Sequence, residues 1–419
     1  MLRVFREPEG FSPDTAVTNE DASPTWQDDS RPGRKLIDYM EPKVHHLLKQ
    51  RDWERVIVVG KYARGGKNIA SESERRGKGF NWQRPTAEII DDDTIQINCF
   101  PSENYVKHHA KLIAKYFKFK KLRRSPVAIF ISIFDRMLVR HVVDASLSSL
   151  DIQRLKQNTD DFRSHASDIF DMSNLRELGK TEIIVLGYLD TCPDRVIDKN
   201  PLLSKIKITD EGKQFSWHKY HTPNGTSVAY LGCAHALWGQ CVSELMNTLR
   251  NLCSVQRLLY VGKAGSLNET IASNEYLATG NVCDVDASLE EHFKTVTTQS
   301  STLFSSDSVQ RGDLVSVASP LCEDEAWYEK NRKKYRWVDC ETAYIARALH
   351  FSGVDFAYLH VVSDNLGKQY SENLANEDDE VVQDKRTKLF EEIDRHIEEY
   401  VQDYERMMQR IGTEPARKD

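Results

Sequence analysis

Two short stretches decide the fold of this chain: Trp337-Val-Asp-Cys-Glu-Thr-Ala-Tyr344 and Val361-Val-Ser-Asp-Asn365. In the first, an acidic pair, Asp339 and Glu341, opens a helix. In the second, Asp364 follows an apolar strand. Open α/β sheets place their ligands at the carboxyl ends of their strands. We therefore expect these carboxylates to meet at one edge of an α/β sheet.

The residues between and before these stretches extend the pattern. A helix is expected over residues 342–351, then a turn at Ser352-Gly353 and an apolar strand over residues 356–362. Upstream, a strand that leads into a glycine turn is expected in Leu258-Leu-Tyr-Val-Gly-Lys-Ala-Gly-Ser-Leu267. Two independent blocks in this order make chance a poor explanation.

In these blocks the chain resembles the nucleoside phosphorylase superfamily, which includes purine nucleoside and uridine phosphorylases, methylthioadenosine/adenosylhomocysteine nucleosidase and AMP nucleosidase. The late motif of that family is an acidic or apolar residue, then Met-Glu, a helix of small residues, an apolar strand and Ser-Asp. Here it reads Asp339-Cys340-Glu341 and Ser363-Asp364. The resemblance covers roughly residues 180–411. It implies an α/β fold: a three-layer nucleoside-phosphorylase-like domain with a mixed, mostly parallel sheet.

The rest of this region fits that fold. Short apolar runs that read as buried strands occupy residues 182–187, 227–232, 282–285 and 313–320. Helices are expected over residues 234–249 and, as an amphipathic closing helix, over residues 381–411. Strands that alternate with helices favour a mostly parallel sheet covered on both faces.

The resemblance implies a role for each motif residue. Glu341 would accept hydrogen bonds from the ribose 2′ and 3′ hydroxyls, and Cys340 takes the place of the family's Met, which packs under the ribose. Asp364 would protonate or hydrogen-bond N7 of a purine as the base departs. The base pocket is expected at Ser319, Ser363 and Trp327. Taken singly, an Asp after a strand or a Glu in a first helical turn also serves as an ordinary helix cap.

The group that attacks the sugar is left open by the sequence. Nucleosidases of the family activate water with a carboxylate after the first strand, where this chain has Asp190. Phosphorylases bind phosphate with arginines and a Ser or Thr, and here Lys263 stands at the Ser or Thr position. Lys263, Arg195 and His235 are therefore candidates for binding phosphate or a 5′ group, and a substrate phosphate would explain Lys263. A lysine that points into solvent is the alternative.

These residues predict an N-glycosidase that hydrolyses the bond between base and ribose in a purine nucleoside or nucleotide. Two alternatives stay open: a nucleoside phosphorylase that uses inorganic phosphate, and a non-catalytic nucleoside-binding sensor, because fold does not fix function. The expected partner is a small nucleoside or nucleotide, with a homo-oligomer as the assembly and no metal or organic cofactor.

Composition agrees with a two-domain enzyme. The chain has 419 residues, of which 40% are hydrophobic and 29% are charged, enough for a core in each half. The net charge of −7 argues against bulk nucleic acid as a partner. No apolar run approaches the length of about 20 residues that a membrane span needs, and the charged start is atypical of a signal peptide, so a cytoplasmic location is expected. The eight scattered cysteines are typical of reduced core residues.

The first half of the chain resembles no family. Residues 1–34 are expected to be a disordered arm, residues 35–179 a smaller α/β domain, and residues 412–419 a tail. The smaller domain is expected to have strands over 55–60, 94–98 and 126–134, helices over 36–50, 103–119 and 148–169, and a long polar loop over 63–93. Lys107, Lys111 and Lys115 predict a basic face on the helix 103–119. The pair His218 and His221 is interpreted as part of a surface loop.

Overall fold

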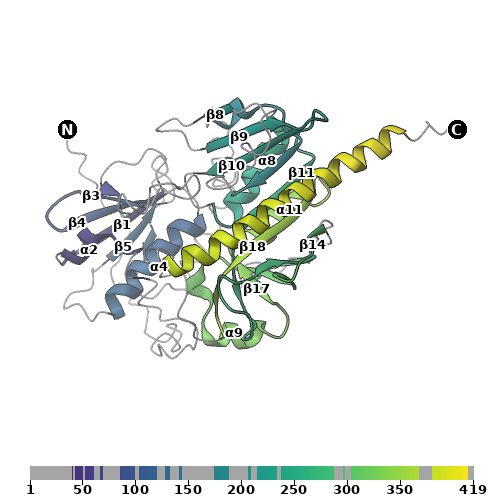
Figure 1. The fold of residues 1–419 in the computed structure, drawn as a ribbon. Coiled ribbons are helices and arrows are strands. Elements are labelled where there is room, and N and C mark those ends of the chain that lie inside the picture. Colours follow the sequence, from purple (N-terminus) through teal and green to yellow (C-terminus); the bar gives the residue numbers. More distant parts are fainter. Residues whose placement is uncertain are drawn as a thin grey trace.

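The computed structural model describes two β-sheets with the helices that flank them (Figure 1). The described residues are 40, 43–50, 52–60, 67–68, 85–99, 103–119, 128–132, 141–143, 174–187, 206–208, 215–233, 237–286, 296–297, 303–367 and 380–413. The expected arm 1–34 and the helix 148–169 lie outside these residues, as does most of the tail 412–419.

The smaller sheet is built from the N-terminal part of the chain. Its strand order is β2-β3-β4-β1-β5-β6, and the central strand β1 pairs in parallel with β4 and β5. Its strands are β1 (Arg55–Gly60), β2 (Lys67–Asn68), β3 (Thr86–Ile89), β4 (Thr94–Cys99), β5 (Ala128–Ser132) and β6 (His141–Val143). Its helices are α2 (His46–Gln50) and α4 (Glu103–Phe119). The expected α/β character of this half is confirmed, and the helix over 103–119 has the expected bounds.

The larger sheet holds twelve of the described strands in a mixed arrangement of parallel and antiparallel pairs. They are β7 (Ile183–Leu186), β8 (Ile206–Ile208), β9 (Phe215–His221), β10 (Ser227–Cys233), β11 (Arg257–Ser266), β12 (Leu277–Thr279), β13 (Val282–Val285), β14 (Val296–Thr297), β15 (Val309–Arg311), β16 (Leu314–Ser316), β17 (Trp337–Asp339) and β18 (Asp355–Asn365). The helical elements are η4 (Asn174–Leu178), α8 (Gln240–Cys253), η6 (Pro320–Cys322), α9 (Glu325–Asn331), α10 (Thr342–Leu349) and α11 (Glu380–Thr413).

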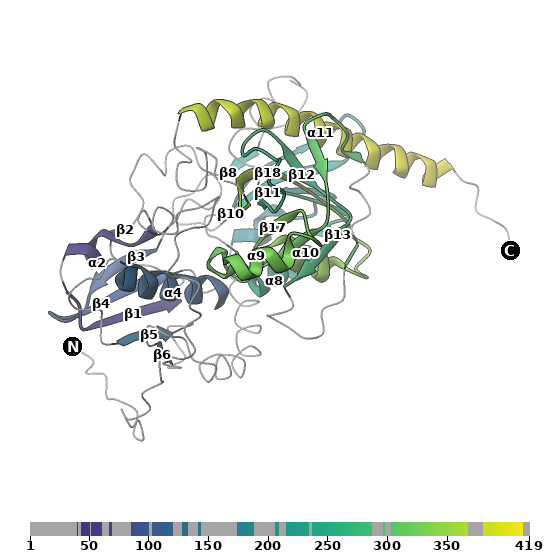
Figure 2. The same ribbon diagram turned by 90° about the horizontal axis from the view of Figure 1, so that it is seen from below.

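Both faces of the large sheet are covered, which gives three layers. Alternate residues of β7 point to opposite faces: Ile184 and Leu186 pack with α8 and α10, whereas Ile183 and Val185 pack with α11. Figure 2 shows α11 on the side of the sheet away from α8 and α10. Strands buried on both faces are continuously apolar, as the sequence of β7 is. The three-layer α/β fold expected from the sequence is therefore confirmed.

Helix α11 is the long closing helix expected at the end of the chain. From Leu389 on, its buried apolar side chains repeat every three or four residues, and they are Leu389, Ile393, Ile397, Tyr400, Val401 and Tyr404. The buried guanidinium of Arg257 joins this helix to the sheet, with Asp403 and Asp355 at 3.0 and 2.9 Å. None of the helices in the described parts of the chain is long and apolar enough to cross a membrane.

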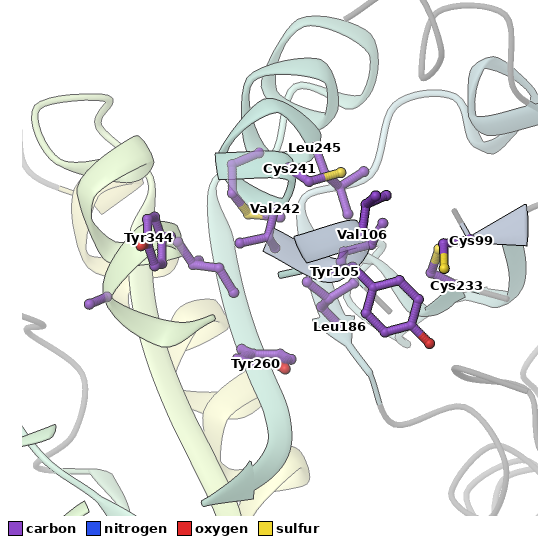
Figure 3. Packing of buried hydrophobic residues seen from close by; sticks show 14 of the residues in the cluster. Cys99, Tyr105, Val106, Leu186, Cys233, Cys241, Val242, Leu245, Tyr260 and Tyr344 are labelled. Carbon is purple, nitrogen blue, oxygen red and sulfur yellow. The ribbon is translucent and has the colours of Figure 1, made fainter. Parts of the chain in front are cut away.

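The two sheets share one apolar core. The cluster that contains Ile95 and Ile97 of β4 continues through α4 into α8 and β7. Figure 3 shows Tyr105 and Val106 of α4 in the same cluster as Leu186 of β7. Six of the cysteines are buried and reduced, as the sequence predicts: Cys99, Cys233, Cys241, Cys253, Cys283 and Cys340.

Several sequence expectations need correction. Helix α8 begins at Gln240, six residues later than expected, because Gly239 before it has φ 60° and ψ −133°, outside the helical region. His218 lies in strand β9 and is buried, so the surface-loop interpretation was wrong. Part of the expected loop 63–93 forms β3, which pairs with β4.

The expected glycine turn is also absent. Gly262 and Gly265 both lie inside β11, whose register with β18 shifts between Ala264 and Gly265. Strand β18 runs on to Asn365, so Asp364 lies within the strand instead of after it.

Candidate active site

Strand β11 lies between the strands that lead to the two predicted carboxylates. Gly265 of β11 is paired with Asp364 on the β18 side and with Val338 on the β17 side. Neighbouring strands lie about 4.8 Å apart, so the backbones at Asp364 and Val338 are separated by about 10 Å. Glu341 follows Val338 by three residues at the start of α10. Strand β18 runs parallel to β11 and β17 runs antiparallel to it, so the two carboxylates come from strands whose carboxyl ends point in opposite directions.

The missing side chain at Gly265 allows side chains of the two neighbouring strands to pack closely against β11. A Cβ atom there would lie 2.7 Å from Cδ1 of Leu366, 3.1 Å from Cγ1 of Val338 and 3.5 Å from Oδ1 of Asp364. A real Cβ does not approach its neighbours as closely as the first of these distances. Glycine is needed here for close approach of side chains and not for a turn.

Asp364 is buried and is held by its neighbour in the strand. The hydroxyl of Ser363 donates a hydrogen bond of 2.9 Å to Oδ1 of Asp364. Its other oxygen, Oδ2, accepts no hydrogen bond from any residue that the structure describes. Ser363 therefore fixes one carboxyl oxygen of Asp364.

Asp339 organises the loop that carries Glu341. Its Oδ1 accepts a hydrogen bond of 2.5 Å from Ser316, and its Oδ2 accepts one of 2.9 Å from the backbone N–H of Thr342. The hydroxyl of Thr342 also donates to Oδ2. Asp339 thus caps the first turn of α10, whose N-cap residue is Glu341.

The side chain of His360 continues this network to β11. Its Nδ1 accepts a hydrogen bond of 3.0 Å from the backbone N–H of Gly262, so the ring proton is assigned to Nε2, which lies 2.7 Å from Oγ1 of Thr342. Burial lowers the pKa of His360 to about 3. A neutral imidazole therefore links β11, β18 and α10 behind the carboxylates.

Electrostatics distinguish Glu341 from an ordinary glutamate. Burial, and then the nearby charge of Asp339, raise the pKa of Glu341 well above its usual range. The backbone N–H of Cys340, which lies 3.2 Å from Oε2 of Glu341, opposes the shift. The pKa of Asp339 is also raised by burial. Shifted carboxyl groups at a sheet edge are typical of functional sites.

Tyr260 is a site residue that the sequence did not indicate. Its ring packs edge-on against His360 at 5.0 Å, and a Cβ at Gly262 would lie 3.0 Å from its hydroxyl. Burial raises the pKa of Tyr260, followed by the charges of Glu341 and Asp339. No residue in the described ranges forms a hydrogen bond with this hydroxyl. A tyrosine in an apolar strand is typical of a core residue, so only the fold reveals its proximity to Glu341.

The predicted base-pocket residues Ser319 and Trp327 lie on the segment that follows β16. Ser319 is buried, caps η6 by accepting a hydrogen bond of 3.1 Å from Leu321, and lies 2.7 Å from Nδ1 of His108. The indole of Trp327 donates to Asp286. The contact between Ser319 and His108 joins residues 211 positions apart.

The remaining predicted residues divide into two groups. Cys340 is buried, and burial raises the pKa of its thiol. Lys263 is exposed on β11, one residue after Gly262. The predictions for Asp190, Arg195 and His235 fall outside the described residues. Within the described ranges, no group of three or more His, Cys, Asp or Glu residues is arranged to hold a metal ion.

Comparison with known proteins gives structural similarity alone. No family model and no curated protein matches the sequence. A futalosine hydrolase mutant of Helicobacter pylori strain 26695 is similar at 16% identity and TM-score 0.40, over 52% of this chain and 99% of that chain.

Two further solved structures are similar over a comparable share of the chain. A putative methylthioadenosine nucleosidase from Weissella paramesenteroides has 13% identity and TM-score 0.41, over 52% of this chain and 97% of that chain. The 5′-methylthioadenosine/S-adenosyl homocysteine nucleosidase of Campylobacter jejuni has 14% identity and TM-score 0.41, over 52% and 99%. At these identities the similarity concerns the fold and not the reaction.

Proposed function

We propose that the chain is an N-glycosidase that hydrolyses the bond between base and ribose in a purine nucleoside or nucleotide. One observation carries the proposal: Gly265 of β11 pairs with Asp364 of β18 on one side and with Val338 of β17, three residues before Glu341, on the other. The two carboxyl groups of the motif therefore flank one strand. The sequence resemblance of the two motifs gives each carboxyl group its role.

In this reaction Asp364 is the acid. The transition state has positive charge on the ribose ring and negative charge on the departing base. Oδ2 of Asp364 donates a proton or a hydrogen bond to N7 of the purine, while Ser363 holds Oδ1. A positioned acid of this kind typically accelerates bond cleavage by about 100-fold to 10,000-fold.

Glu341 is the anchor for the ribose. Its raised pKa favours the protonated form in the free protein, which can donate to one ribose hydroxyl and accept from the other. The developing positive charge on the ring favours the carboxylate, so the interaction strengthens in the transition state. The Asp339 network keeps this side chain at the edge by fixing the start of α10.

Water is the proposed nucleophile. The sequence places Asp190 after β7, where a carboxylate would activate it, and Lys263 at the position where a phosphorylase would have Ser or Thr. Lys263 would instead bind a phosphate carried by a nucleotide substrate. A cytoplasmic homo-oligomer that acts without a cofactor remains part of the same proposal.

A product screen tests the proposal. Purified protein would be incubated with purine and pyrimidine nucleosides and their 5′-monophosphates, with and without inorganic phosphate, and the products identified by mass spectrometry. Free base together with ribose or ribose 5-phosphate, formed without inorganic phosphate, supports hydrolysis. Ribose 1-phosphate, formed only when phosphate is present, would assign the chain to the phosphorylases. Binding without turnover would indicate a sensor.

A further inference from the structure

One face of helix α4, which flanks the smaller sheet, lies against the loops of the candidate site. Positions 104, 108, 111 and 115 share this face, because residues three or four apart occupy the same helix face. Asn104, at the N-terminal end, reaches Gly239, since a Cβ there would lie 1.8 Å from Nδ2 of Asn104. Lys111 and Lys115 reach the η6 loop, where their charges lower the pKa of the Cys322 thiol against the larger, opposing effect of burial.

The strongest contact on this face is between His108 and Ser319. Both side chains are buried, and Nδ1 of His108 lies 2.7 Å from Oγ of Ser319. Oγ already accepts a hydrogen bond from the N–H of Leu321, so its own hydrogen is free to be donated to Nδ1. We assign His108 as the acceptor. Ser319, the first residue of the η6 loop, then donates a hydrogen bond to His108 and accepts one from Leu321.

The same helix also contacts the loop on the sugar side. Trp238 packs edge-on against Tyr105 at 5.2 Å and against His108 at 4.8 Å, and it adjoins the apolar cluster that contains Cys340. The N–H of the next residue, Gly239, donates a hydrogen bond of 3.1 Å to the carbonyl of Cys340. Helix α4 therefore contacts two loops. One is the loop of Ser319, on the proposed base side, and the other is the loop of Trp238 and Gly239, which contacts Cys340 on the proposed sugar side.

We propose that helix α4 of the smaller sheet forms a wall of the nucleoside site, and that His108 is a positioning residue for base recognition. His108 acts through Ser319 and fixes the loop Ser319–Cys322 against which the base lies. This gives the N-terminal half of the chain a part in substrate discrimination. The inference rests on the proposed function for its substrate and on the contacts of α4 for its geometry.

Three substitutions test the role of His108. His108→Ala removes the acceptor for the Ser319 hydroxyl, whereas His108→Asn places an amide oxygen near the position of Nδ1. Lys107→Ala, on the adjacent and partly exposed face of α4, is the matched control. The readout is the ratio of kcat/KM for adenosine to that for inosine, with kcat and KM measured separately.

We expect His108→Ala to change this ratio by about 10-fold, mainly through KM, because a freed loop binds the two bases more equally. His108→Asn should restore most of the wild-type ratio, and Lys107→Ala should retain it. The double variant with Ser319→Ala should be no worse than His108→Ala alone, since both changes break one interaction. An unchanged ratio in His108→Ala, or equal effects of Ala and Asn, would overturn the proposal.

A second measurement separates this inference from the proposed function. Amide hydrogen exchange at Leu321 and Cys322 reports the loop directly and needs no turnover. We expect exchange about 10-fold faster in His108→Ala and wild-type exchange in Lys107→Ala. This result supports the role of α4 as a wall of the site even if neither nucleoside is cleaved. Wild-type protein that cleaves no nucleoside rejects the proposed function alone. Equal exchange in all variants rejects the role of His108 alone.

Discussion

Gly265 of β11 lies directly opposite Asp364 of β18, and a Cβ atom at Gly265 would stand 3.5 Å from Oδ1 of that aspartate. The glycine therefore allows the side chain of the proposed acid to pack close to β11. Val338 of β17 approaches the same position from the other side, at 3.1 Å from that Cβ. Close packing between the strands of the proposed acid and anchor depends on this one residue.

Replacing Gly265 with Ala should cost more free energy in transition-state binding, measured through kcat/KM, than in the free energy of unfolding. The new methyl group meets Leu366 at 2.7 Å and Val338 at 3.1 Å, so one of these flexible side chains must move toward the site. A misplacement of about 1 Å can reduce turnover about 100-fold. Steady-state kinetics and thermal unfolding would be measured together. A variant that lost stability but kept its kcat/KM would show that the glycine at position 265 is needed for packing alone.

The pattern of residues in the sequence was sufficient to predict the sheet and to single out the proposed carboxylates. Strand β7 is an unbroken apolar run, β18 is apolar over residues 356–362 except for His360, and the acids of the motif stand close to such runs in sequence. The alternation of strands and helices therefore predicted a sheet covered on both faces, and the resemblance pointed to Asp364 and Glu341. The glycine turn failed because Gly262 and Gly265 serve close packing inside a strand, a use that leaves the same sequence signal as a turn.

Contacts between distant segments were beyond the sequence. The links from Ser316 to Asp339, from Thr342 to His360 and on to Gly262 join four segments, and no spacing rule connects them. The approach of His108 to Ser319 depends on how the two sheets pack. Such residues carry no local pattern, because their partners are chosen by tertiary structure.

The raised pKa of Glu341 predicts a pH-dependent effect on stability. The folded protein retains a proton that the unfolded chain releases above about pH 4.3, so wild-type stability falls as pH rises toward the folded pKa. Glu341→Gln cannot ionise. We expect this variant to be more stable than wild type by about 1 kcal/mol or more at pH 8, and by less at pH 5.

Urea unfolding of both proteins at the two pH values measures this difference. The exposed Glu398, changed to Gln, is the control for the loss of one carboxylate from the chain. A difference for Glu341→Gln that is the same at pH 5 and pH 8 would contradict the raised pKa.

Tyr260→Phe removes only the hydroxyl that lies near Glu341. Because no described residue forms a hydrogen bond with that hydroxyl, stability should be unchanged or slightly higher. If the hydroxyl contacts the sugar or the attacking water, kcat/KM should fall by about 10-fold, the loss of one hydrogen bond. Tyr358→Phe is the control, because the Tyr358 hydroxyl contacts the carbonyl of Gly312. Unchanged kinetics in Tyr260→Phe would limit Tyr260 to a packing role.

Lys263→Ala should separate nucleotides from nucleosides. If Lys263 binds a substrate phosphate, the variant should lose about 1 to 3 kcal/mol in kcat/KM for a 5′-monophosphate and much less for the matching nucleoside. Lys263→Arg keeps the charge and should retain most of the preference. Parallel kinetics with a purine nucleoside and its 5′-monophosphate give the comparison. Equal losses for the two substrates would mean that Lys263 only shapes β11.

Asp364→Asn tests the assignment of Asp364 as the acid. Glu341→Gln is the variant with which it is compared. The asparagine keeps the size of the side chain and a hydrogen-bonding group but has no transferable proton, so base release should slow by about 100-fold or more while binding changes little. Glu341→Gln should instead weaken recognition of the sugar, and its effect should shrink on 2′-deoxy and 3′-deoxy substrates that lack the hydroxyl it holds. Single-turnover rates and substrate binding would be measured for both variants. Unchanged turnover in Asp364→Asn would reject the acid role, and equal losses on ribose and deoxyribose substrates would reject the anchor, because the two carboxyl groups act on opposite sides of the bond that breaks.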